Sequence, residues 1–216
     1  TPLSVKYLTY VRNPRRPAPF FRHAQRTEFL HMQAHSKAEA YLDTALDALS
    51  GGDLCPSVLD KLPVPIYTTD EAGAVTYWNR ACVDFAGREP TLGEDHWCVT
   101  WQIYTTSGDR LPHHKCPMAQ AIREERSIRG SVAIAMRPDG TRRAFTPYPT
   151  PLFDDDGKLI GAVNMLVDVS AEQAQVLADQ AKRCRRLADA TYDRQTCGVL
   201  SNMAEQFAAT AEQLAL

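Results

Sequence analysis

The fold is decided by a stretch that begins with Pro65-Ile66-Tyr67-Thr68-Thr69-Asp70, turns at Glu71-Ala72-Gly73 and continues with Ala74-Val75-Thr76-Tyr77-Trp78-Asn79-Arg80-Ala81. Two short apolar runs around a glycine-containing turn predict a β-hairpin. The stretch closes with Asp154-Asp155-Asp156-Gly157 and an apolar run from Leu159 to Ser170. This ending predicts one long closing strand after a second tight turn.

Between these two ends, the pattern predicts an α+β domain with one antiparallel sheet. Residues 131–136 alternate between two sets of side chains, as a strand does. Helices are expected between the second and third strands, at 79–85 with an end at Gly87, and at 117–126, whereas 91–112 is expected to be mostly loop. The five expected strands are 65–70, 74–78, 131–136, 142–152 and 159–169.

The flanking segments divide the chain into four parts. Residues 1–35 hold several prolines and arginines without a helical period, which predicts an irregular arm. Residues 36–55 begin with the capping box Ser36-Lys37-Ala38-Glu39 and predict one helix. The domain is expected at 56–170, opening with a short helix over 56–62. Residues 171–216 hold two apolar stripes with a plausible cap at Asp193, which predicts a helical hairpin or a coiled-coil tail.

Composition excludes several classes of protein. The net charge of −2 gives no basic face for nucleic acid. No apolar run is long enough to span a membrane, and no segment has the order of a signal peptide. The six cysteines are scattered and form no C-x-x-C pair, which argues against a zinc site or a disulfide framework and favours a reducing cytoplasm. The usual nucleotide, hydrolase and metalloprotease motifs are missing, so the sequence predicts a protein that is not an enzyme.

The order of several short motifs resembles a known family. The hairpin with its W-N-x-A helix start and the closing Asp168-Val169-Ser170 resemble the two ends of a PAS domain. The middle resembles the sensor PAS domains of bacterial HWE-type histidine kinases; its motifs are Trp97-Cys98-Val99-Thr100-Trp101, Leu111-Pro112, Cys116-Pro117-Met118-Ala119, Arg137-Pro138-Asp139-Gly140-Thr141 and Tyr148-Pro149-Thr150-Pro151-Leu152. The resemblance covers about half the chain. It implies a five-stranded PAS sheet and a sensory, signal-transducing role. No histidine follows His114, so the C-terminal helices carry no phosphoacceptor histidine, and we expect a sensor domain without the kinase.

The resemblance also implies a ligand pocket between the sheet and its helices. In the register of the resembling domains, Ala162, Asn164 and Leu166 face this pocket. A buried Asn164 must find a hydrogen bond, either from a ligand or from a neighbouring loop. Further candidates for the lining, which are equally compatible with a plain core, are Trp97, Trp101, Tyr104, Met118, Ile122 and Tyr148.

The alternate residues of the closing strand, Val163, Met165 and Val167, then point to the other face of the sheet. Because they are apolar, a helix of the chain or a second subunit is expected to cover them. This face is the best indication in the sequence of a homodimer, and the chain's own helices are the alternative.

The sequence does not identify a cofactor. A heme-based gas or redox sensor is an alternative function, with His96, His113 or His114 as the axial ligand. The G-x-N-C-R-F-L run of flavin photosensors is missing, which argues against flavin. An enzyme with an unrecognised small-molecule site is the other alternative. The preferred prediction is a non-enzymatic sensory module that binds a small ligand, dimerises or contacts a signalling protein.

Overall fold

The computed structural model describes residues 37–49 and 56–215. The predicted arm, the capping box at Ser36 and the thiol of Cys55 lie outside the described residues. Residues 37–49 form a helix in which Ala38, Leu42 and Ala45 are buried. The chain divides into two compact units, Thr1–Tyr41 and Leu42–Leu216, and the sheet and the C-terminal helices belong to the second.

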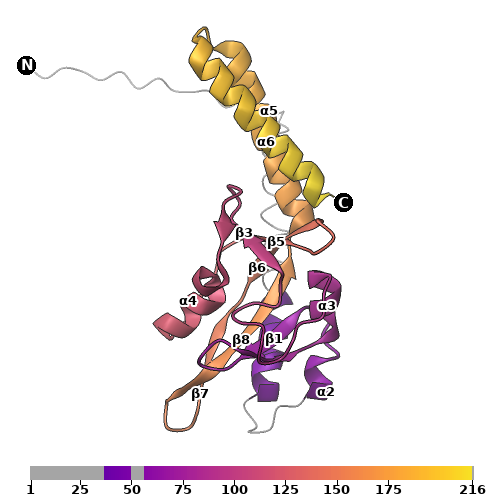
Figure 1. The fold of residues 1–216 in the computed structure, drawn as a ribbon, viewed down its shortest axis with the longest axis vertical. Helices are drawn as coiled ribbons and strands as arrows, with labels where there is room; N and C mark the ends of the chain where they lie inside the picture. The colour runs from indigo at the N-terminus through magenta and orange to yellow at the C-terminus, as the bar shows by residue number, and fades with distance from the viewer. Residues whose placement is uncertain (1–36, 50–55, 216) are drawn as a thin grey trace, which may run out of the picture. The chain divides into compact units, whose positions relative to one another are not determined.

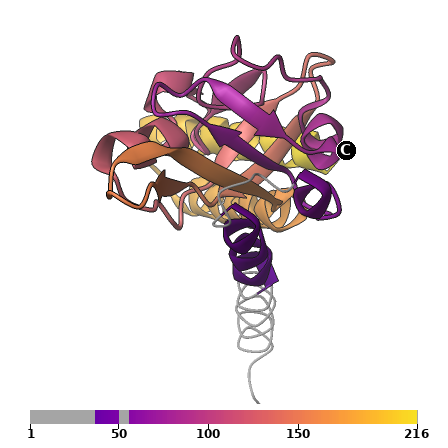
Figure 2. The ribbon, with the colours of Figure 1, turned by 90° about the horizontal axis from the view of Figure 1, so that it is seen from below.

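One antiparallel sheet forms the body of the second unit (Figure 1). Its strand order is β2-β1-β8-β6-β5-β3-β4, and β7 also pairs with β8. In Figure 2 the strands curve across one another, with the C-terminal helices behind them in orange and yellow. The strands are β1 (Ile66–Thr69), β2 (Val75–Trp78), β3 (Gln102–Tyr104), β4 (Arg110–Leu111), β5 (Ala133–Met136), β6 (Arg142–Pro147), β7 (Thr150–Phe153) and β8 (Leu159–Asp168).

The α+β fold class is confirmed, but the sheet has eight strands rather than the predicted five. The segment 91–112, expected to be loop, contains β3 and β4, which are too short to show an apolar period. The strand expected at 142–152 is two strands, because Pro147 and Pro149 remove backbone donors where β6 ends and β7 begins.

The helices begin and end largely where local signals predict. Asn79 and Gly87 cap α3, and Asp193 caps α6 through a 2.7 Å hydrogen bond from the amide of Thr196. The helix α2 ends three residues earlier than expected, and α4 ends two residues earlier. None of the helices in the described part could cross a membrane. Their bounds are α2 (Pro56–Leu59), α3 (Arg80–Ala86), the 3₁₀ turn η1 (His113–Lys115), α4 (Pro117–Glu124), α5 (Ser170–Ala190) and α6 (Arg194–Leu214).

Two apolar clusters lie on opposite faces of the sheet. The inner cluster joins the sheet to α3 and α4 and includes Tyr67, Phe85, Met118 and Leu166. The rings of Phe85 and Phe145 meet edge to face in it, with centroids 5.6 Å apart. The outer cluster joins β5 and β6 to α5 and α6. The sheet therefore lies between the short helices on one face and the C-terminal pair on the other.

Candidate functional site

A buried hydrogen-bonded chain crosses the inner face of the sheet. The hydroxyl of Tyr67 donates to the carbonyl of Trp97 at 3.0 Å and accepts from Nδ2 of Asn164 at 2.9 Å. Oδ1 of Asn164 accepts from the amide of Tyr148 at 2.9 Å. Asn164 therefore links β8 to β1 and to the segment after β6, which is the structural role that the sequence left open beside a ligand role.

The pocket candidates separate into two groups. Ala162, Leu166, Met118 and Ile122 belong to the inner cluster, and Trp97 packs against it. Tyr148 is buried, with the guanidinium of Arg129 5.4 Å from its ring centroid. Trp101, by contrast, is 45% exposed, and Tyr104 packs in the outer cluster beside α5 and α6. These two side chains do not line the interior: Trp101 precedes β3, and of β3 only Ile103 belongs to the inner cluster.

Tyr67 is the residue that the sequence argument missed. It lies opposite Asn164 in the β1–β8 register, so alternation along the first strand could have placed it on the same face. Complete burial raises the pKa of its hydroxyl, and the thiols of Cys98 and Cys116 lie in its electrostatic surroundings. Burial likewise raises the pKa of the Cys116 thiol to about 12. These groups therefore stay protonated and act as hydrogen-bonding and packing groups at neutral pH.

Two buried polar atoms on the inner side have no hydrogen-bond partner among the described residues: Oγ1 of Thr69 and Nε1 of Trp78. Trp78 lies opposite Tyr67 in the β1–β2 register, and its ring packs against the inner cluster. Buried polar groups are rarely left unpaired. The hydroxyl of Thr69 and the indole N–H of Trp78 are therefore the exceptions to the otherwise bonded polar groups on this side of the sheet.

An open groove of about 810 Å³ lies at the β3–β4 end of the sheet. Its walls come from the segment 94–97, from β3 and β4, and from η1. The groove contains all three histidines named as candidates from the sequence, together with two of the candidate aromatic residues and the cation Arg110. The five candidates are His96, Trp97, Trp101, His113 and His114. The histidines therefore lie along this groove rather than in the inner cluster.

Two acidic residues, Glu94 and Asp95, also line the groove. The carboxylate of Asp95 forms an ion pair with Arg88 at 2.6 Å and accepts from the amide of Thr91 at 2.7 Å. Burial lowers the pKa of His113; the nearby Asp95 carboxylate opposes this shift, and the guanidinium groups of Arg88 and Arg110 add to it. Among the described residues, no cluster of three or more histidine, cysteine or acidic side chains is arranged to hold a metal ion.

The wall of the groove is conformationally constrained at Trp97. Its φ of 68° lies in the left-handed region, which is unusual for a residue other than glycine. Its amide donates to the carbonyl of Gly73 at 2.7 Å, and a Cβ at Gly73 would lie 2.4 Å from the indole ring. The turn between β1 and β2 thus needs a glycine in order to hold the indole in place. The carbonyl of the same tryptophan accepts from Tyr67, so the groove and the interior chain share one residue.

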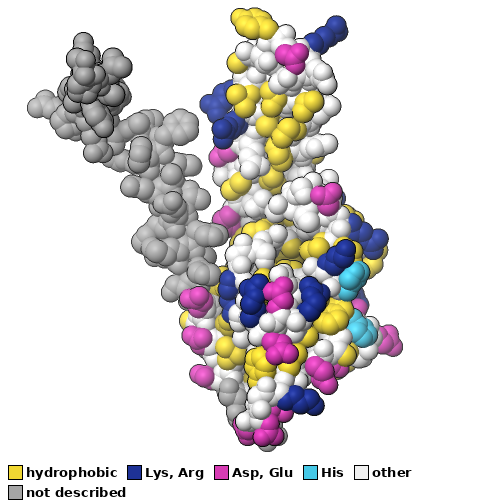
Figure 3. All heavy atoms as spheres, turned by 90° about the vertical axis from the view of Figure 1, so that its left-hand side faces the viewer, with side chains coloured by type: hydrophobic (Ala, Val, Ile, Leu, Met, Phe, Trp, Pro, Cys, Tyr) yellow, Lys and Arg dark blue, Asp and Glu magenta, His cyan; other side chains and the backbone are white. Residues whose placement is uncertain are grey.

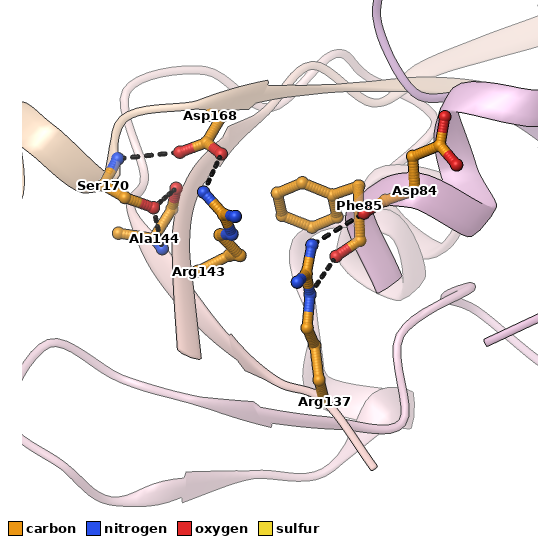
Figure 4. Close-up of polar contacts among 7 residues, drawn as sticks. All are labelled: Asp84, Phe85, Arg137, Arg143, Ala144, Asp168 and Ser170. Atoms are coloured by element: carbon orange, nitrogen blue, oxygen red, sulfur yellow. Dashed lines mark hydrogen bonds and ion pairs between the residues drawn. The ribbon is translucent and has the colours of Figure 1, made fainter. Parts of the chain in front are cut away.

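The end of β8 is linked to the first turn of α5 (Figure 4). Oδ1 of Asp168 accepts from the amide of Ser170 at 2.9 Å, and its other oxygen lies 3.5 Å from Nη1 of Arg143. Oγ of Ser170 accepts from the amide of Ala144 at 2.9 Å. In the same view, Arg137 donates to the carbonyl of Phe85 at 2.8 Å. The Asp168-Val169-Ser170 motif therefore fixes the start of α5 against β6.

The outer face of β8 is covered within a single chain. Val163 and Met165 are fully buried, and Val167 packs against the cluster that α5 and α6 form. At Val167 the chain's own helices supply the cover, which is one of the two alternatives that the sequence allowed.

The comparisons with known proteins concern the fold. A search of curated protein sequences finds no match. Among solved structures, the LOV protein of Rhodobacter sphaeroides is 14% identical over 72% of this chain and 91% of that chain, with a TM-score of 0.41. The LOV domain of the blue-light activated histidine kinase EL346 of Erythrobacter litoralis is 21% identical over 50% and 98%, with a TM-score of 0.37. The PAS domain of the fruit-fly ELK potassium channel is 12% identical over 57% and 96%, with a TM-score of 0.42.

The sequence match is more informative than these structural likenesses. Residues 59–174 match a family model whose description is the PAS fold, and domains of that family are generally sensory or signalling modules. The matched segment contains the inner cluster, the groove and the junction with α5. Because the match spans more than half of the 216 residues, the chain belongs to the PAS family.

Proposed function

We propose that the chain is a non-enzymatic sensory module, of the type found in HWE-type histidine kinases, that detects a small molecule and passes the change to α5 and α6. The observation that carries this proposal is the continuous path from Trp97 through Tyr67 and Asn164 to β8. Four residues after Asn164, the same strand reaches Asp168, whose contacts position the first turn of α5.

The groove is the proposed binding site because it has the size of a small-molecule site. The half-exposed indole of Trp101 offers a flat apolar surface, and the guanidinium of Arg110 offers up to five donors. The Nδ1 atom of His96 donates to the carbonyl of Glu94 at 2.8 Å when it carries the proton, which leaves Nε2 as an acceptor. These groups suit a planar molecule with an acidic group at one end.

A ligand shifts a module only if it binds two of its conformations unequally. Here the constrained backbone at Trp97 is the element that a ligand would bias, since its ring lines the groove and its carbonyl contacts Tyr67. A small shift of that carbonyl lengthens or shortens the hydrogen bond of Tyr67, and Asn164 transmits the change to β8.

The relay is tested without knowledge of the ligand by a double-mutant cycle. Hydrogen exchange of the amides of Ser170 to Ala174 is measured in full-length W97A, Y67F and the double variant. Y67F keeps the ring but removes the hydroxyl, so we expect it to speed exchange and to abolish any further effect of W97A. W101A is the control, because Trp101 lines the groove but makes no contact with the polar chain; it should leave exchange unchanged. Additive effects of W97A and Y67F would refute the relay.

The ligand is sought by native mass spectrometry of the chain purified from its own host. We expect a small-molecule adduct that W101A and R110Q lose, and that the exposed-surface variant R123Q keeps. An adduct that survives both groove variants but is lost in W78F would move the site to the interior, where Nε1 of Trp78 is unpaired. Absence of any adduct, together with identical exchange in native and in refolded protein, would contradict ligand sensing.

The heme alternative requires an axial histidine, and its candidates His96, His113 and His114 all lie along the groove. Addition of hemin to the purified chain decides it: a Soret band that H113A or H96A abolishes would favour a heme sensor over the proposed one. The unpaired cysteines of the described residues support a reducing, cytoplasmic setting for either sensor.

A further inference from the structure

The C-terminal hairpin has an unusual distribution of side-chain size. The seam between α5 and α6 is filled mainly by small residues, among them Ala181, Ala188, Ala204 and Ala211. Four larger apolar side chains of the same helices are 39–54% exposed: Val176, Leu187, Val199 and Met203. A two-helix hairpin that buries alanines and exposes larger residues gains little apolar burial from its own seam.

The four exposed residues share one side of the hairpin. Each directly precedes a residue that is buried or partly buried in the seam: Leu177, Ala188, Leu200 and Ala204. One position back along an α-helix is a rotation of about 100°. Because α5 and α6 run antiparallel around a short link, the same sense of rotation on both helices leads to the same side of the pair. Figure 3 shows hydrophobic side chains gathered along this helical part of the molecule.

The two sides of the hairpin differ in charge. On the apolar side, the other positions that precede a seam residue are Gln180, Arg183, Thr210 and Gln213, so this row has a single charge. On the opposite side, the positions that follow a seam residue include Lys182, Arg185, Asp189, Glu205 and Glu212, all exposed. Charged residues in such a row mark a solvent face, whereas a nearly uncharged apolar row marks an interface.

We infer that the apolar side of the hairpin, the row Val176, Leu187, Val199 and Met203, is the interface with a second copy of this chain. This inference deepens the sensory proposal by naming the surface through which two modules would meet. A second copy presents the same nearly neutral apolar row, and a two-fold axis across it pairs the two rows in an isologous contact. Four helices then enclose a common core, as in a four-helix bundle.

The size of the face suits a dimer. A helix of 21 residues is about 31 Å long and about 10 Å across with its side chains, so two helices side by side present a face about 20 Å wide. The side of the hairpin therefore offers roughly 600 Å² per subunit, or about 1,200 Å² in all, which is the lower limit of the usual size of a stable interface. An interface of this size is expected to be weak or transient rather than a permanent complex.

The test is the mass of the full chain in solution over about 1–200 µM, by sedimentation equilibrium and light scattering. Wild type should approach twice the chain mass of 24.1 kDa. V199E and V199E/M203E should weaken dimerisation at least about 100-fold, because like charges opposed across an interface are strongly unfavourable. G198E is the matched control: it places the same charge one residue away on the other side, where a Cβ meets no atom within 4 Å, and should dimerise like wild type.

A second measurement does not depend on variants. Exchange of the amides from Val199 to Phe207 should slow as the wild-type concentration rises. A monomer at every concentration, or a dimer that V199E/M203E leaves intact, would overturn the interface. A monomer in which V199E lowers thermal stability would show instead that another part of the same chain covers the face. None of these outcomes changes the result expected from the hydrogen-exchange double-mutant cycle of W97A and Y67F. Failure of the interface is therefore separable from failure of the sensory proposal.

Discussion

The inner face of the sheet and the C-terminal hairpin are built in opposite ways. On the sheet, large side chains such as Tyr67 and Leu166 point inward, and the polar groups of Asn79 and Asn164 are bonded several times each. In the hairpin, small side chains occupy the seam while larger apolar ones are exposed. The sheet is complete within one chain, whereas the hairpin has an unused apolar side. The first region is therefore expected to be sensitive to substitution, and the second to be tolerant.

The largest effect is expected at Gly161 in β8. A Cβ there would lie 2.0 Å from the carbonyl oxygen of Thr69, at a φ of 149°. G161A must therefore displace backbone in the paired strand, and we expect it to lower the free energy of unfolding by about 3–5 kcal/mol in a urea titration. G140A is the matched control, since its Cβ meets no atom within 4 Å and only its φ of 85° is unfavourable. It should cost about 1 kcal/mol, and equal losses in the two variants would contradict the close approach.

A somewhat smaller loss is expected at Asn79, the cap of α3. Its Nδ2 donates to the carbonyls of Leu59 and Val64, at 3.1 and 2.9 Å, and its Oδ1 accepts from the amide of Ile66 at 3.0 Å. N79A leaves these buried groups unpaired, which should cost about 3 kcal/mol in the same titration. N79D keeps the oxygen that accepts from the amide of Ile66, but it replaces the donor Nδ2 with a second oxygen opposite the two carbonyls. This variant should therefore be destabilised as well. If N79A lowers the free energy of unfolding by less than about 1 kcal/mol, the sheet tolerates substitution better than expected.

A pH effect is expected at His113 in the groove. Burial lowers its pKa below the unfolded value near 6.5, so on acidification the unfolded chain takes up the proton first. The unfolded state then binds more protons than the folded state, and stability falls as the pH drops below about 6.5. The urea midpoint should decrease more between pH 7.5 and 5.5 in wild type than in H113N. The exposed neighbour provides the control variant H114N, and an unchanged pH dependence in H113N would contradict the assignment.

The smallest effect, with the opposite sign, is expected at Gly198 in α6. The position is exposed, lies inside a helix and has free space around its Cβ. G198A should therefore stabilise the hairpin by up to about 1 kcal/mol, measured as slower amide exchange in α6. Destabilisation by this change would mean that the tolerant region is packed more closely than the structure shows, and the contrast with the sheet would weaken.

Local signals predicted much of the fold. The turn at Glu71-Ala72-Gly73, the cap at Asn79 and the alternation of β8 depend on a few adjacent residues, so they can be inferred from the sequence. The short strands β3 and β4 could not be, because two or three residues contain no period and these strands form only through their pairing with β5 and with each other.

The candidate site was predicted less completely. The alternation of β8 correctly separated Ala162 and Leu166 from Val163 and Met165, since side-chain period is a local property. Trp101 and Tyr104, named as candidates for the pocket lining, lie outside the inner cluster: Trp101 precedes β3 and lines the groove, and Tyr104 packs in the outer cluster. Their positions depend on how β3 pairs with its neighbours in the sheet. Arg110 was missed for the same reason: only the pairing of β3 with β4 brings it to the groove.

The sequence by itself determined the family, the order of the main elements and the two faces of β8, because these follow from spacings and periods along the chain. Only the tertiary structure decided that Asn164 bonds to Tyr67, 97 residues away in the chain, and that Trp97 joins the groove to that pair. It also decided which side of the hairpin is left apolar, because that depends on how α5 and α6 turn toward each other. Such contacts form between residues distant in the chain, and no local pattern encodes their partners.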